Sequence, residues 1–122
     1  MIWLASMGLG QSGGSSNQIN VVEPHGDLDL TSAPALKRRL RTAIDHDGQL
    51  VLVDLTAVTF IDSSGLAALV FAYLRLRSSG GRIAVVAPLE HQRRVFATAG
   101  LDTILGVRAT KADAVARVTG VA

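Results

Sequence analysis

Cysteine is absent from this chain of 122 residues, which excludes disulfide bonds, zinc-thiolate sites and thiol catalysis. Its three histidines, His25, His46 and His91, are scattered and lack the spacing of a metal-binding motif. We therefore expect neither a metal site nor a cofactor of the chain's own.

The chain also lacks a large excess of charge of either sign, because 12 Lys and Arg against 10 Asp and Glu leave a formal net charge of +2 at pH 7. The basic residues gather modestly at residues 37–41 and at Arg93-Arg94, without the dense stripe that follows a phosphate backbone. We expect no direct contact with nucleic acid. The first cluster is either the solvated side of a helix or a partner-binding patch.

Long apolar runs are missing too, since no segment reaches the roughly 18 uncharged apolar residues of a membrane span. The N-terminus, MIWLASMGLGQSGG, lacks the basic start and sustained apolar stretch of a signal peptide. These absences predict a cytoplasmic protein that does not contact a membrane.

The composition, with 48% hydrophobic and 18% charged residues, is that of one globular domain. Aromatic residues make up only 4%, so aliphatic side chains must fill the core. Residues 10–16 are rich in Gly and Ser. We expect residues 1–17 to be a flexible segment, in which residues 2–7 could add a strand, and residues 18–122 to be the domain.

The apolar patterns alternate between the periods of strands and helices. Strands are expected at residues 18–23, 50–55, 82–87 and 104–108, and a turn at residues 26–31. Helices are expected from residue 31 or 32 to about residue 44, from residue 63 or 64 to a stop at residues 78–81, and at residues 91–99 and 111–118. This alternation predicts an α/β domain with a largely parallel sheet.

Residues 51–74 organise the rest of the chain. The β-branched run at residues 50–55 predicts a central strand covered on both faces. Ser63 and Ser64 stand where the pattern changes to a helical period, so their hydroxyls can cap the helix while Asp62 favours its positive end. A phosphate on either serine would suit that helix end, and its charge would be felt by a partner.

The helix that follows is apolar on every side over residues 66–74. One face must cover the sheet. The opposite face is either buried under the preceding helix or forms a docking surface beside the serines.

These residues resemble the anti-sigma factor antagonist branch of the STAS (sulphate transporter and anti-sigma antagonist) domains. The most specific match is Asp62-Ser63-Ser64-Gly65-Leu66, preceded by Val53-Asp54-Leu55 and Val58-Thr59-Phe60-Ile61. Further matches, in the same order as in the family, are Gly26-Asp27-Leu28-Asp29-Leu30-Thr31-Ser32-Ala33-Pro34, Gly80-Gly81 and Arg93-Arg94-Val95-Phe96-Ala97-Thr98-Ala99-Gly100-Leu101.

The resemblance implies a STAS-like (SpoIIaa-like) single domain with a mixed or mostly parallel sheet of four to five strands and about four helices. It also implies a regulator of transcription without enzymatic activity. Such a protein, when unphosphorylated, binds an anti-sigma factor that has serine kinase activity and thereby frees a sigma factor. Phosphorylation ends the binding, and a serine phosphatase restores it. A weak homodimer is left open.

The family's phosphorylation site corresponds to Ser64, with Ser63 as the alternative. The residues expected to bind the partner are Asp29, Thr31, Asp62, Ser63, Ser64, Gly65 and Leu66.

The sequence leaves three other interpretations to consider. The chain could be a STAS scaffold in a bacterial stress-signalling complex. Asp27-Leu28-Asp29-Leu30-Thr31 matches the DxDxT motif of haloacid-dehalogenase-type phosphatases, but Glu90, Asp102 and Asp113 are too widely spaced for the magnesium-binding acidic pair that this chemistry needs. Ser63 or Ser64 as a catalytic nucleophile would need a GxSxG elbow around it, and neither of these two serines stands in one.

Overall fold

The computed structural model describes residues 18–47 and 50–120. The elements of this part of the chain are, in order, β1 (Ile19–Val22), β2 (Gly26–Leu28), α2 (Ala33–Asp47), β3 (Leu50–Asp54), β4 (Val58–Ile61), α3 (Ser63–Ser78), β5 (Arg82–Val86), α4 (Glu90–Thr98), β6 (Val107–Arg108) and α5 (Lys111–Thr119).

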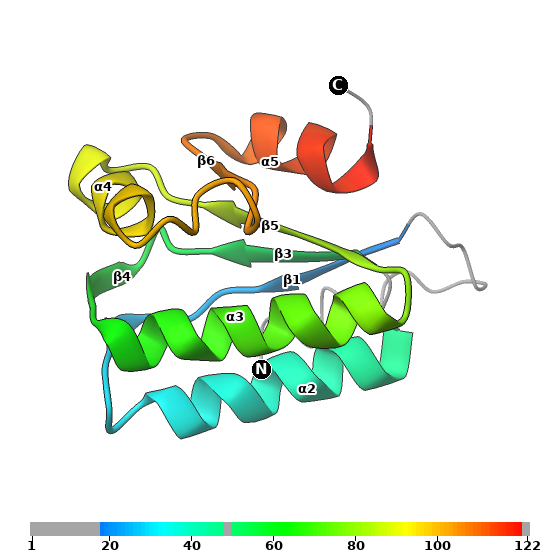
Figure 1. The fold of residues 1–122 in the computed structure, drawn as a ribbon, viewed down its shortest axis with the longest axis horizontal. Coiled ribbons are helices and arrows are strands. Elements are labelled where there is room, and N and C mark those ends of the chain that lie inside the picture. The colour runs from blue at the N-terminus through cyan, green and yellow to red at the C-terminus, as the bar shows by residue number, and fades with distance from the viewer. Residues whose placement is uncertain (1–17, 48–49, 121–122) are drawn as a thin grey trace.

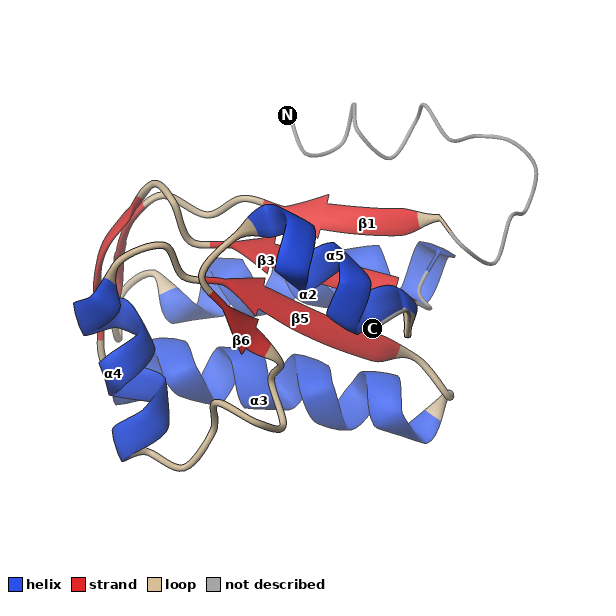
Figure 2. Cartoon of the chain, turned by 90° about the horizontal axis from the view of Figure 1, so that it is seen from above, coloured by secondary structure: helices blue, strands red, loops and turns tan. Residues whose placement is uncertain are grey.

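The main sheet has four strands in the order β1-β3-β5-β6, and neighbouring strands run parallel (Figures 1 and 2). β2 and β4 form a separate parallel pair. Val53 of β3 lies between Val22 of β1 and Val85 of β5, so the predicted central strand is at the centre. The predicted α/β fold with a mostly parallel sheet is confirmed.

Helices cover both faces of the sheet. α2 and α3 lie side by side on one face, and α5 lies on the other (Figure 1). Val51 and Val53 face the larger core under α2 and α3, while Leu52 faces the smaller core under α5, and none of the three is exposed. This two-sided burial explains why β3 is apolar at consecutive positions.

The expected strands differ from the structure in three places. Residues 26–31 contain β2 as well as a turn, and β4 was not predicted, because these two short strands pair only with each other and carry no long apolar pattern. The strand predicted at residues 104–108 is only Val107–Arg108. Before it, the N–H groups of Leu105 and Gly106 bond to carbonyls within their own turn, so they do not join the sheet.

The extra strand predicted at residues 2–7 lies outside the described residues. Within the described ranges no helix is both long enough and apolar enough to cross a membrane.

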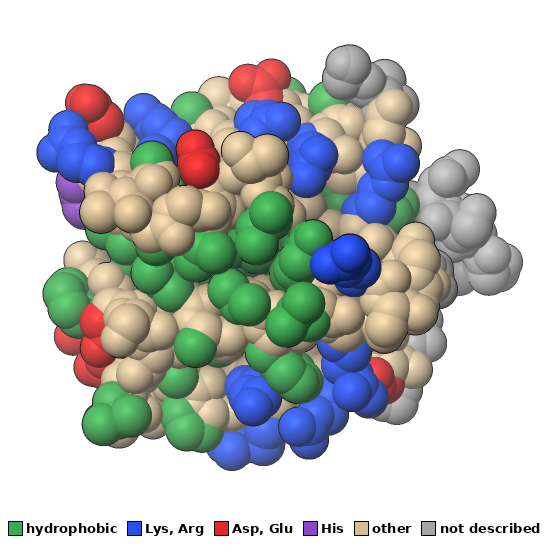
Figure 3. Space-filling model, viewed as in Figure 1, with side chains coloured by type: hydrophobic (Ala, Val, Ile, Leu, Met, Phe, Trp, Pro, Cys, Tyr) green, Lys and Arg blue, Asp and Glu red, His purple; other side chains and the backbone are tan. Residues whose placement is uncertain are grey.

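The apolar helix α3 is partly covered by α2. Phe71 lies beneath two cations of α2, with Lys37 Nζ 4.5 Å and Arg41 Cζ 5.6 Å from its ring centre. Arg75 donates to both carboxylate oxygens of Asp45 at 2.9 and 3.0 Å, and this hydrogen-bonded pair raises the pKa of Arg75. α3 still leaves a band of hydrophobic side chains at the surface (Figure 3). Complete burial of α3 is therefore ruled out.

Candidate functional site

The candidate site lies at the carboxyl end of the sheet, where ligands of parallel α/β folds commonly bind. It comprises the loop after β2 and the turn between β4 and α3. The N–H of Asp62 donates to the carbonyl of Leu28 at 3.0 Å, so the two loops are joined directly. Acidic side chains are visible at this end of the molecule, where α2 and α3 begin (Figure 3).

Asp62 caps α3. Its Oδ1 accepts the N–H of Ser64 at 2.8 Å and that of Gly65 at 3.3 Å. The prediction that the serine hydroxyls form the cap was wrong, because an extended residue directly before the helix is better placed to reach these N–H groups than residues already inside its first turn. Within the described residues neither serine hydroxyl makes a hydrogen bond, so both are open to chemistry.

The two serines differ in exposure. Ser63 is exposed and Ser64 is half-buried. Both are in the first turn of α3, where the helix dipole favours negative charge, although the Asp62 carboxylate already bonds two of the N–H groups. A phosphoryl group on either serine would therefore add its charge next to Asp62 instead of replacing it as the cap.

The loop after β2, residues 29–32, is called the Asp29 loop here and is held by hydrogen bonds within itself. Asp29 Oδ1 accepts the N–H groups of Thr31 at 3.0 Å and Ser32 at 3.1 Å. Ser32 Oγ accepts the N–H of Asp29 at 3.0 Å and donates to the carbonyl of Asp27 at 2.6 Å. The Ser32 hydroxyl thus bonds back into the loop and not to the N–H groups of α2. This network holds the loop in one shape with Thr31 exposed.

The structure brings the predicted partner-binding residues to one end of the molecule. Thr31 and Ser63 are exposed, and Asp29, Asp62, Ser64 and Leu66 are half-buried. Gly65 is buried against Leu28, where it lets the start of α3 approach β2 closely, and its contact with a partner stays a prediction. Leu66 packs partly on the core.

Two exposed apolar side chains at this end were missed by the sequence reasoning. Leu30 is 77% exposed in the Asp29 loop, and Phe60 is 54% exposed on β4, opposite Asp27. There was little sign of them in the sequence, because a single apolar residue in a short segment shows no hydrophobic periodicity. Leu30 follows Leu28, which bonds to Asp62, and Phe60 stands two residues before Asp62, so both add apolar surface at this end of the molecule.

Gln92 on α4 was also missed by the sequence reasoning. Its side chain forms hydrogen bonds with the segment between β3 and β4, which precedes the serines in the chain. Its Nε2 donates to the carbonyls of Leu55 at 3.1 Å and Val58 at 3.2 Å, and its Oε1 accepts the N–H of Leu89 at 3.0 Å. The side chain is buried. It therefore fixes the connection from β3 to β4, which leads directly to Asp62.

The acidic residues of the DxDxT motif serve this loop structure. Asp27 Oδ1 accepts the Thr59 hydroxyl at 2.8 Å, and Asp29 bonds within its own loop. Among residues 18–47 and 50–120, no group of three or more His, Cys, Asp or Glu side chains is placed to hold a metal ion. The described chain does not gather the acidic residues that the phosphatase interpretation needs.

Comparison with known proteins gives a consistent result. The STAS domain family model matches residues 15–114. The anti-sigma-B factor antagonist of Listeria monocytogenes is 29% identical over 83 residues, which is 68% of this chain and 73% of that protein. The crystal structure of an anti-sigma factor antagonist from Mycobacterium paratuberculosis superposes with a TM-score of 0.74 at 32% identity, covering 82% of this chain and 85% of that one. The anti-sigma factor antagonist SpoIIAA in its unphosphorylated form gives a TM-score of 0.69 at 25% identity, covering 85% and 90%.

Proposed function

The chain belongs to the STAS domain family, and we propose that it is an anti-sigma factor antagonist whose binding is switched by phosphorylation of Ser64. Its relatives are named as antagonists, which regulate by binding and not by catalysis, and this chain is a regulator of that kind. In the proposed cycle, the unphosphorylated chain binds an anti-sigma factor that has serine kinase activity, and a sigma factor is released. Phosphorylation ends this binding, and a serine phosphatase resets it.

The observation that carries the proposal is the setting of Ser64. Its hydroxyl makes no hydrogen bond within the described residues, and it lies in the first turn of α3 next to the exposed Ser63. The choice of Ser64 over the more exposed Ser63 rests on the family resemblance. SpoIIAA, a relative of similar fold, has been solved in an unphosphorylated form, which is in keeping with control by phosphate.

Phosphate at Ser64 would oppose docking for two reasons. It adds about 1.5 to 2 negative charges that a partner would have to desolvate. It also places them beside the carboxylate of Asp62, so a partner that is complementary to the unmodified surface would meet additional negative charge there. The fold itself should tolerate the group, because no hydrogen bond among residues 18–47 and 50–120 uses this hydroxyl.

The test begins with a pull-down from the source cells, using the unphosphorylated chain as bait. We expect a kinase-fold anti-sigma factor, which would then be purified and titrated calorimetrically. Ser64→Asp should weaken its binding about a hundredfold, equivalent to about 3 kcal/mol. Ser78→Asp, at the other end of α3, is the matched control and should bind like the wild type.

A second step locates the phosphate. With the recovered partner and Mg²⁺-ATP, Ser63→Ala should be labelled and Ser64→Ala should not. The reverse pattern would move the site to Ser63. Recovery of other stress-signalling proteins without any kinase-fold partner would contradict sigma release and favour the scaffold interpretation.

A further inference from the structure

The side of α3 that faces away from the sheet carries a line of residues that is apolar in its middle. Ser63, Ala67, Val70, Leu74 and Arg77 follow one another at spacings of four and three residues, which places them along one line of the helix, here called the α3 stripe. Four of them are exposed and Val70 is half-buried. Because α3 lies along one edge of the molecule (Figure 2), the α3 stripe is open to another protein.

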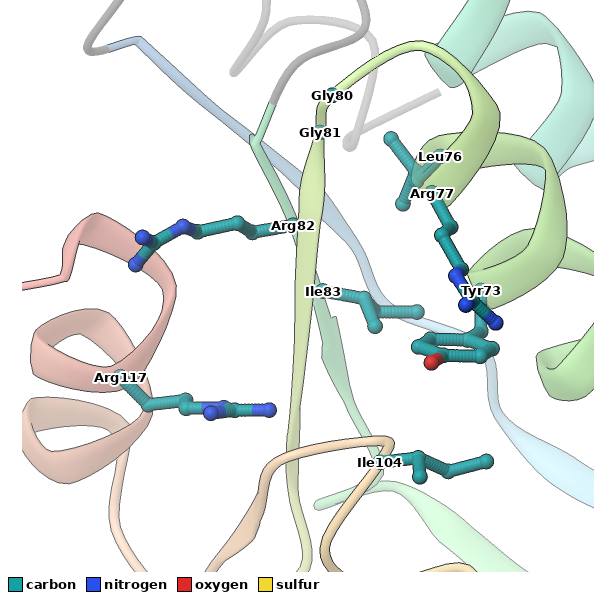
Figure 4. Close-up of a pocket in the computed structure, with 9 residues that line it drawn as sticks. All are labelled: Tyr73, Leu76, Arg77, Gly80, Gly81, Arg82, Ile83, Ile104 and Arg117. Atoms are coloured by element: carbon teal, nitrogen blue, oxygen red, sulfur yellow. The ribbon is translucent and has the colours of Figure 1, made fainter.

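The two ends of the α3 stripe carry opposite charges. At its start, the carboxylate of Asp62 stands directly before Ser63 and caps the helix. At its other end, Arg77 lies beside Tyr73 (Figure 4) and forms no ion pair with a described residue. Arg75, the other arginine in the last turn, is paired with Asp45 instead. Arg77 is therefore the cation that this end of α3 offers to a partner.

We propose that the α3 stripe binds the α3 stripe of a second copy of this chain, with the two helices antiparallel. A twofold axis near Val70 would bring Ala67 of each copy close to Leu74 of the other, so a small side chain meets a large one. The exposed apolar surface of both copies would be covered. Arg77 of each copy would meet the Asp62 end of the other, and each copy thus adds a cation beside the other's serines.

The charges along α3 favour this occupant over others. Two copies in parallel order would bring Arg77 against Arg77 and Asp62 against Asp62, and like charges in contact are repelled. An acidic helix from another protein would suit the Arg77 end but would be repelled at the Asp62 end. Lys37 and Arg41 of α2 lie over the ring of Phe71, which is not part of the α3 stripe. One helix per copy makes a small contact, so we expect a Kd between about 10 µM and 1 mM.

This self-association is separate from the proposed switch. It concerns the unmodified chain alone and requires neither a kinase nor an anti-sigma factor. Failure of one proposal therefore leaves the other untouched. One consequence does rest on the proposed function: the dimer would cover Ser63, so a chain within it could not dock a partner through the turn before α3.

Sedimentation of the full chain over a series of concentrations measures the association. Leu74→Asp and Arg77→Glu should each weaken it about tenfold, the first by placing a charge in the apolar contact and the second by like-charge repulsion at the Asp62 end. Ser63→Lys combined with Arg77→Glu exchanges the charges and should restore the affinity to within about threefold of the wild type. Leu89→Asp is the matched control, because Leu89 is 49% exposed at the start of α4, and it should associate like the wild type.

A spin label determines the order of the two helices. Because the chain has no cysteine, Ser78→Cys gives a single site for a nitroxide, and the labelled chain is mixed with ¹⁵N-labelled wild type. We expect broadening of the wild-type amides at residues 62–66. Broadening at residues 74–78 instead, or only outside α3, would overturn the antiparallel contact. The proposal is also overturned if the chain stays monomeric up to about 1 mM, or if Leu74→Asp associates as tightly as the wild type.

Discussion

A Cβ atom on Gly65 would lie 2.7 Å from the carbonyl oxygen of Leu28 and 2.8 Å from its Cβ. The same carbonyl accepts the N–H of Asp62 at 3.0 Å. The start of α3 therefore rests directly on the end of β2. This contact joins the Asp29 loop to the turn between β4 and α3, so we expect a partner that binds one of them to contact the other as well.

Gly65→Ala should destabilise the fold. In an open helix this change would stabilise by up to about 1 kcal/mol, but here the methyl meets backbone and we expect a net loss of about 1 to 3 kcal/mol. Urea unfolding followed by circular dichroism measures it. Ala67→Gly, at an exposed position of the same helix, is the control and should cost about 1 kcal/mol through propensity alone. An alanine at position 65 that is neutral or stabilising would contradict the close packing.

Asp62→Ala should remove the cap of α3. The N–H groups of Ser64 and Gly65 lose their acceptor, and the expected cost is about 1 kcal/mol in the free energy of unfolding. Thr110→Ala is a useful comparison, because Thr110 caps α5 through the N–H of Asp113 and lies far from the serines. Hydrogen exchange should quicken at the start of α3 only in the first variant. Unchanged exchange there would show that Asp62 is not the effective cap.

Gln92→Leu should be costly although the volume is nearly conserved. The carbonyls of Leu55 and Val58 and the N–H of Leu89 would lose their buried partner, and we expect a loss of about 2 to 4 kcal/mol. Chemical denaturation measures this loss. Gln92→Glu keeps the acceptor but not the donor and should also destabilise, whereas wild-type stability in both variants would mean that the brace is not needed.

Leu30→Ser should weaken partner binding without changing stability. Leu30 is 77% exposed, so the domain loses little burial, while a minority of interface side chains, those packed near the centre, each cost more than about 1 kcal/mol when truncated, and we expect Leu30 to be one of them. We expect at least about a fivefold loss of affinity by calorimetry. Leu74→Ser, at a 53% exposed position of α3, is the matched control. If only the Leu74 variant loses affinity, docking follows the body of α3 and not the Asp29 loop.

Two kinds of element could be predicted from the sequence. One is a strand that is buried on both faces and is therefore apolar at consecutive positions, and the other is an element with a clear hydrophobic periodicity. β3 is an example of the first, because Val51, Leu52 and Val53 enter two different cores and so form a continuous apolar run. The position of the serines at the start of a helix was predicted for a similar reason. The period changes there from that of a strand to that of a helix.

The remainder depends on contacts between distant residues. β2 and β4 exist because they pair with each other across the sequence, and Gln92 is a brace only because α4 folds over the connection after β3. The cap was assigned to Ser63 or Ser64 instead of Asp62 because the boundary was off by one residue, and a shift of one residue decides which side chain faces the first N–H groups.

The affinity of the recovered anti-sigma factor for the chain before and after enzymatic phosphorylation tests the switch most directly, provided that mass spectrometry has placed the phosphate. We expect the phosphate on Ser64 and an affinity at least about a hundredfold lower in the modified form. Equal affinities for a chain fully phosphorylated at Ser64 would contradict the account.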